Sequence, residues 1–287
     1  MSCDFLLFTK KIVAGNKHLQ FLMALVFAGN ILNAQPAPMD QHARDSLLNI
    51  VNGNSQDSNK VHAFYALSRG TTLSNIAESL DFGNKGLDLA RKIKFPMGEL
   101  ECLEALSFTY AITSSFEKGF STAYEGIDLS KKYAPIRAIY GINMMGLLYQ
   151  KLGDDKEALK WAQNAYYHPD IKQADHFTQW SAVFLLAQEH ERLNNLDSAY
   201  HFALQTLDYS KQYFPFQADY PMLILARVNS KLKKYDEAVS YGKQALEASE
   251  KNNEAFFENE VQNELATIYF NDDQPDSAKK YASLALE

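Results

Sequence analysis

The chain has 287 residues, of which 46% are hydrophobic and 22% charged, and its formal net charge is −7 at pH 7. This hydrophobic content is ample for a large core and excludes a disordered chain. The acidic balance and the lack of a long basic run argue against a nucleic-acid partner.

The N-terminal segment, residues 1–34, differs in kind from the rest of the chain. Lysines precede an apolar run over residues 21–32, which ends in small and polar residues around Ala34. This order predicts a secretory signal peptide cleaved after Ala34. The alternative is an uncleaved membrane anchor, for which the run is short and interrupted. We expect an exported protein, periplasmic or extracellular, of a Gram-negative bacterium.

Residues 35–57 are expected to form a linker and a preliminary helix. The helix is predicted over Asp40–Val51, where it would cover the open face of the element that follows. The turn-rich stretch 52–59 then leads into a repeated region.

The remainder, residues 58–287, repeats with a period of 39–41 residues. The small residues at one repeat position, and those four residues further on, mark one face of a helix that another helix can approach closely. The anchors of the six copies are Ser79, Gly119, Ala158, Ala199, Ala238 and Ala278. Each copy is therefore expected to be two antiparallel helices, and successive copies are expected to stack.

The connection between the two helices of a copy is clearest in the third one. Gly153 is expected to end the first helix, and Asp154 to cap the second, with Glu157 completing a capping box. The proline that follows each second helix is expected to mark its end. Such prolines are Pro96, Pro135 and Pro215.

These positions resemble the tetratricopeptide repeat, a helix–turn–helix unit normally of 34 residues. The small residue of its first helix matches Gly146, Ala187, Ala226 and Ala266, and its tyrosine matches Tyr110, Tyr149 and Tyr269. The resemblance implies an all-α fold, a right-handed superhelical α-solenoid of about six repeats, with the last repeat incomplete or uncapped. The longer period suggests second helices extended by about one turn. With a signal peptide in front, the architecture resembles the exported sensor regions of bacterial membrane histidine kinases and related regulators.

Candidate catalytic chemistry is sparse. The sequence contains no glycine-rich phosphate loop, no HExxH and no GxSxG. The histidines show no paired ligand spacing. Cys102 is expected to be a buried, inert thiol, and Trp161 to belong to the core. We therefore expect neither an enzyme nor a cofactor or metal site.

The resemblance also implies a concave groove lined by the first helices. The cations at equivalent places, Lys151, Arg192 and Lys231, are expected to form a basic stripe, or alternatively to complement the dipoles of their own helix ends. The groove positions carried over from the family are Tyr140, Asn143, Gln150, Lys151, Phe184, Gln188, Arg192, Tyr220, Arg227 and Lys231. The residues that clamp a peptide carboxylate in chaperone-binding members are mostly missing, since Leu147 occupies one of their places.

Two functions remain open at this point. The first is a non-enzymatic exported module that holds a protein or peptide partner in the groove. The second is the periplasmic sensory region of a membrane-bound signalling protein whose other domains are absent from this chain. The identity of the partner is not readable from the residues.

Overall fold

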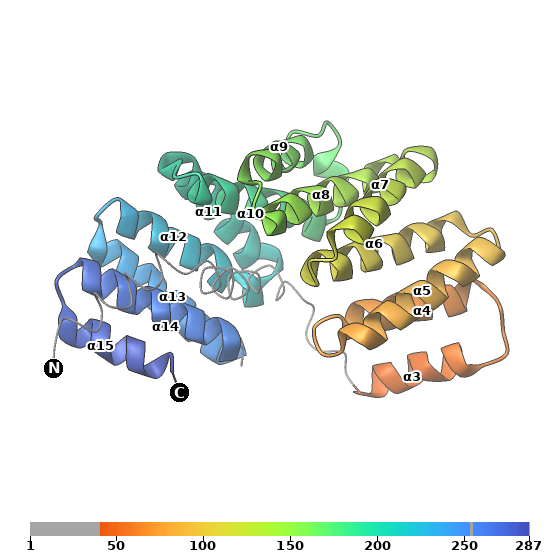
Figure 1. Ribbon diagram of the computed structural model, residues 1–287, viewed down its shortest axis with the longest axis horizontal. Helices are drawn as coiled ribbons and strands as arrows, with labels where there is room; N and C mark the ends of the chain where they lie inside the picture. The colour runs from red at the N-terminus through yellow and green to blue at the C-terminus, as the bar shows by residue number, and fades with distance from the viewer. Residues whose placement is uncertain (1–40, 253–254, 287) are drawn as a thin grey trace. The chain divides into compact units, whose positions relative to one another are not determined.

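The computed structural model describes residues 41–252 and 255–286, and over this part of the chain it is built of α-helices without strands (Figure 1). The predicted signal peptide lies outside the described residues. The first described element, α3 (Gln41–Asn52), packs against α4. Its partly buried residues Leu47 and Leu48 contact the core of the first repeat.

Six helical pairs follow α3, so the predicted all-α solenoid is confirmed. The two helices of each pair pack closely on each other, and each second helix also contacts the first helix of the next pair. The first helices are α4 (Ser58–Thr71), α6 (Pro96–Ile112), α8 (Ala138–Leu152), α10 (His176–Arg192), α12 (Asp219–Lys231) and α14 (Ala255–Asn271). The second helices are α5 (Ile76–Lys92), α7 (Phe116–Tyr133), α9 (Asp155–Tyr166), α11 (Leu196–Tyr213), α13 (Tyr235–Asn252) and α15 (Pro275–Leu284).

The turn inside the third pair has the predicted glycine and cap but not the predicted capping box. The backbone N–H of Asp154 donates to the carbonyl oxygen of Tyr149, and the carboxylate of Glu157 pairs with Lys160. Gly153 adopts the left-handed conformation, with φ of +86°, and Asp154 accepts a hydrogen bond from the backbone N–H of Glu157 at 3.2 Å. The corresponding turns of other pairs hold a residue with a side chain at positive φ. Examples are Asn194 at +59° and Lys233 at +61°. Left-handed backbone costs such residues about 1–2 kcal/mol, so the packing of the helices imposes this turn even without glycine.

Small residues bring the two helices of a pair together. Ala158, Ala162 and Ala165 of α9 are fully buried. A Cβ atom on Gly146 would stand 2.5 Å from Leu185 Cδ2 and only 3.5 Å from the backbone nitrogen of Ala162. The close helix approach predicted from the small repeat positions is therefore present.

We expect Ala162→Leu to lower the free energy of unfolding by about 1–3 kcal/mol, because the added side chain has no room between α8 and α9. Lys156→Leu adds the same side chain at an exposed position of α9 and serves as the control. Urea denaturation of the two variants measures the difference. Equal stability of both variants would contradict the packing described here.

The second helices of the first five pairs account for the long repeat with one exception, and α15 of the sixth pair has 10 residues. Helices α7, α11 and α13 have 18 residues each and α5 has 17, whereas α9 has only 12. The expected extension is thus wrong for the third repeat. Pro169 disfavours helical backbone in the residue before it, and a short 3-10 helix, η2 (Ile171–Gln173), follows instead.

The prolines after the second helices mark the links between repeats rather than the helices themselves. Pro96 is the first residue of α6. Pro135 and Pro215 each begin a 3-10 helix, η1 (Pro135–Arg137) and η3 (Pro215–Gln217). A fixed φ and a missing N–H suit these starting positions.

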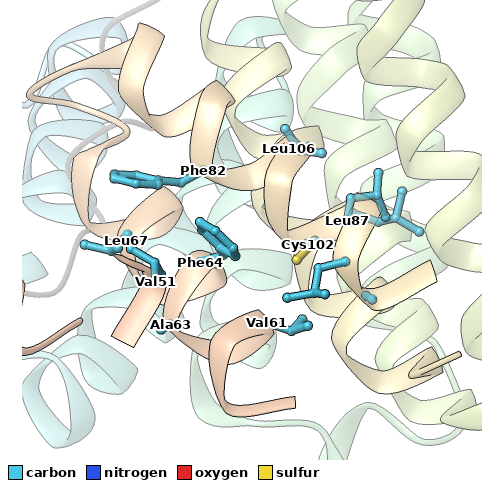
Figure 2. Close-up of a cluster of buried hydrophobic side chains, with 12 residues drawn as sticks. Val51, Val61, Ala63, Phe64, Leu67, Phe82, Leu87, Cys102 and Leu106 are labelled. Atoms are coloured by element: carbon cyan, nitrogen blue, oxygen red, sulfur yellow. The ribbon is translucent and has the colours of Figure 1, made fainter. Parts of the chain in front are cut away.

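The core of the first two repeats shows how the stack is filled. Figure 2 shows Phe64 of α4, Phe82 of α5 and Cys102 of α6 among the side chains gathered between these helices. Cys102 is fully buried, and a Cβ on Gly86 would lie 2.7 Å from its sulfur. Burial raises the pKa of the Cys102 thiol to about 12, which disfavours the reactive thiolate.

Candidate functional site

The first helices of the pairs form a continuous inner layer. Each of them contacts the first helix of the next pair, from α4 through to α14, whereas the second helices make no comparable contact with one another in the described residues. Helices on the shorter radius of a curved stack lie closer together than those on the longer radius. The free faces of the first helices therefore form the inner surface of the repeat region.

At the N-terminal end of this surface, Arg69 of α4 reaches across several repeats. Its Nη1 donates a hydrogen bond to the hydroxyl of Tyr140 at 2.8 Å. The guanidinium carbon also lies 5.4 Å from the ring centre of Phe108 and 6.0 Å from those of Tyr140 and Phe177. These rings belong to α6, α8 and α10, so one side chain of the first repeat joins the next three.

An ion-pair network lies beside this arginine. Arg137 donates to both carboxylate oxygens of Glu104, the first at 3.0 Å, and lies 3.8 Å from Glu101. Glu101 also contacts His62 Nδ1 at 2.7 Å. Burial raises the pKa of Glu104, although the hydrogen bond from Arg137 opposes that shift.

In the C-terminal half, the predicted cations form ion pairs with acids of other repeats. Arg192 Nε donates to Asp155 at 2.8 Å, and Lys231 pairs with Glu191. Arg227 pairs with Glu260 and, through Nε at 3.1 Å, with Glu264. Burial lowers the pKa of Arg227, but the two carboxylates outweigh burial and the net pKa is raised. This surface is therefore of mixed charge rather than a purely basic stripe.

Between α8 and α10 lies a buried acid. Gln150 Nε2 donates to Glu189 Oε1 and, at 3.3 Å, to Gln188 Oε1. Glu189 is fully buried, and its Oε2 has no hydrogen-bond partner among the described residues. Burial raises the pKa of Glu189 to about 7, against the opposing effects of Gln150 and Arg192. Burial and the charge of Arg192 lower the pKa of nearby Lys151 to about 8.

The aromatic residues expected in the groove are buried instead. Tyr140, Phe184 and Tyr220 are 8%, 3% and 3% exposed. The ring centre of Phe184 lies 4.8 Å from that of Trp180 and 6.1 Å from that of Tyr220. Asn143, buried as well, donates to the carbonyl oxygen of Thr178 at 3.1 Å. These positions face the next first helix, so they hold the layer together and are not open to a partner.

The acids that pair with these cations were not predicted from the sequence, although their spacing from the cations indicates the pairing. Glu264 lies 37 residues after Arg227, and Asp155 lies 37 residues before Arg192. Opposite charges separated by nearly one repeat are expected to meet between successive repeats. Arg227 and Glu264 do so on neighbouring first helices, and Arg192 meets Asp155 at the start of α9. By contrast, the contact of Arg69 with Phe177 spans three repeats and has no such signal.

Two further properties concern the described residues only. No cluster of histidine, cysteine, aspartate and glutamate there is suited to hold a metal ion. No helix there is long and apolar enough to cross a membrane.

Trp161, expected in the core, is only half-buried and lies at the surface of α9.

Comparison with known proteins agrees with this architecture. Residues 222–252, in the fifth helical pair, match the family model of the tetratricopeptide repeat. No curated protein matches the chain. Among solved structures, a Rap protein complexed with Competence and Sporulation Factor is 12% identical, with a TM-score of 0.64, over 95% of this chain and 86% of that one.

Two other solved structures are similar to the same extent. The apo form of RapI is 11% identical, with a TM-score of 0.65, over 93% of this chain and 97% of that one. The apo form of the quorum sensor NprR from B. thuringiensis is 14% identical, with a TM-score of 0.60, over 92% of this chain and 86% of that one. At such identities the likeness is one of fold.

Proposed function

We propose that this tetratricopeptide-repeat solenoid is a non-catalytic scaffold that holds an extended protein or peptide segment against the inner surface of its first helices. The observation that carries the proposal is the run of charged side chains along that surface. It extends from His62 and Arg69 in the first repeat to Glu260 and Glu264 in the sixth. A partner with charges of its own can exchange into these ion pairs, which favours specificity and fast association.

The solved structures support the same use of the fold. A Rap protein of similar fold is complexed with Competence and Sporulation Factor. That similarity covers nearly the whole of this chain, so it includes the inner layer and not merely one repeat. The transfer to this protein rests on its own charged surface, since the residues themselves are only 12% identical.

A charge-removing variant tests the proposed surface. Lys151→Gln, Arg192→Gln and Lys231→Gln together are expected to leave helicity unchanged and to weaken binding of a peptide selected on the wild-type protein at least tenfold. The peptide comes from an array of 15-residue sequences, and calorimetry measures its affinity. Attraction by these cations should also weaken as salt rises.

A second triple variant is the matched control. Lys85→Gln, Lys131→Gln and Lys160→Gln remove the same charge from lysines that pair within their own second helices. We expect this control to bind the selected peptide as the wild type does. If both triple variants bind alike, or if the first one only unfolds at a lower temperature without a binding defect, the inner surface is not the binding site.

Export is a separate part of the proposal. The lysines, the apolar run and the boundary at Ala34 support cleavage by a signal peptidase. Mass spectrometry of the protein purified from its native cells is expected to find an N-terminus near Gln35. An intact N-terminal segment on a cytoplasmic product contradicts export, and leaves the binding proposal untouched.

A further inference from the structure

A shallow, open surface cavity of about 420 Å³ lies at the end of α9. It is lined by Trp161, Gln163 and Asn164 of α9, by Ile142 of α8, and by residues 167–169. This is the place where α9 stops after 12 residues, while α11 and α13 continue to 18. The shortened helix thus leaves an open depression in which a ligand could lie against the exposed end of α9.

Aromatic side chains stand open at this cavity. Tyr167 is 68% exposed, the half-buried Trp161 lines the same space, and Tyr124 packs edge-on against Trp161 with ring centres 6.3 Å apart. Exposed aromatic rings bury much area per side chain when a ligand covers them. Their flat faces suit a ligand that offers a flat apolar face of its own.

The amide groups of the cavity are neutral, and the carboxylate of Asp170 lies 4.0 Å from Nδ1 of the lining His168. Gln163 and Asn164 are exposed amides, each with donor and acceptor atoms side by side. The backbone N–H of Asp170 donates to His168 Nδ1 at 3.2 Å. An accepting Nδ1 places the proton of the neutral ring on Nε2, which becomes a donor. No aspartate, glutamate, lysine or arginine is among the lining residues.

We propose that this cavity binds one or two rings of a neutral saccharide. The C–H face of a pyranose ring would stack on Trp161 or Tyr167, and neighbouring hydroxyls would exchange hydrogen bonds with the amides of Gln163 and Asn164. Saccharide hydroxyls both donate and accept, which matches amide side chains. A proline-rich segment fits less well, because its extended helix needs a groove several residues long and it offers acceptors without proline N–H donors.

Tryptophan emission gives a direct reading of this cavity. The chain has two tryptophans, and the other, Trp180, is only 1% exposed and donates to Ser210 Oγ at 2.8 Å. Cellohexaose, maltohexaose and chitohexaose are the probes, and a decaproline peptide is the counter-probe. We expect at least one hexasaccharide to change the emission saturably, with a matching heat in calorimetry, and decaproline to have no effect.

Variants locate the binding. Asn164→Ala, an exposed change that leaves the core intact, and Trp161→Ala are each expected to weaken hexasaccharide affinity at least tenfold by calorimetry. Tyr241→Ala changes the aromatic residue at the same repeat position outside the cavity, and should have no effect on affinity. The proposal is overturned if no hexasaccharide binds, if decaproline binds in their place, or if Asn164→Ala binds as the wild type does. None of these outcomes bears on peptide binding at the inner surface.

Discussion

Arg227→Met is expected to lower the free energy of unfolding by about 3–5 kcal/mol, more than any other single substitution proposed for this protein. The Arg227 side chain is 16% exposed and pairs with Glu260 and Glu264, which are 11% and 20% exposed. Methionine keeps the aliphatic length but removes the guanidinium. Two poorly solvated carboxylates then lose the guanidinium that both of them pair with, and that loss of compensation dominates the cost.

A matched arginine separates burial from charge. Arg91 also pairs with two carboxylates, Glu99 at 2.8 Å and Glu125, but it is 43% exposed. Arg91→Met should therefore cost less than about 1 kcal/mol, because water screens an exposed pair. Chemical denaturation at constant salt compares the two variants. Equal losses would show that Arg227 acts by packing alone.

Neutralising the acids provides the complementary test. Adding Glu260→Gln and Glu264→Gln to Arg227→Met removes both carboxylate charges together with their arginine partner. We expect this triple variant to recover most of the lost stability, because a neutral group of similar size can replace a buried ion pair at little cost. A triple variant as unstable as the single one would mean that the geometry of the network, and not its charge, stabilises α12 against α14.

The fold was predictable because the same pattern of small and large residues recurs in all six repeats. Small residues at Ala158 and its equivalents let the two helices of a pair pack closely. The turn at Gly153 and Asp154 depends on local sequence alone. The lengths of single helices were less predictable. The shortening of α9 depends on one local departure, around Pro169, that a pattern averaged over six copies conceals.

The site was predictable in part. Lys151, Arg192, Arg227 and Lys231 do lie on first helices, but their partners come from other repeats, and repeat positions alone do not reveal which acids are in reach. Burial of Phe184 likewise depends on the neighbouring Tyr220. Which surface is open therefore follows from the spacing of helices in the stack, and that is a property of the whole array.

Glu189 makes the stability of the protein depend on pH. Its carboxyl lies fully buried between α8 and α10, and burial raises its pKa from 4.5 to about 7. Because the folded pKa is the higher one, the folded state binds the proton more tightly than the unfolded state. The stabilisation from that proton is complete below about pH 4.5 and is lost as the pH rises through about 7.

We expect this one group to lower the free energy of unfolding by on the order of 2–3 kcal/mol between pH 4.5 and pH 7.5, at 1.36 kcal/mol for each unit of pKa shift. Other charged groups also act on it, namely Arg192, Asp155 and Glu191. The difference between wild type and variant isolates the contribution of Glu189. Glu189→Gln should unfold at nearly the wild-type denaturant concentration at pH 4.5, and at a clearly higher one at pH 7.5.

A surface carboxylate on the neighbouring helix gives the control for this pH dependence. Glu157→Gln removes the charge of a side chain that is 38% exposed and pairs with Lys160 at 3.2 Å. Its stability should follow the wild type at both pH values within a few tenths of a kcal/mol. If Glu189→Gln also follows the wild type, Glu189 is ionised in the folded protein, and an unseen partner must then stabilise its second oxygen. If only Glu189→Gln departs, the interface between the third and fourth repeats holds a proton near neutral pH.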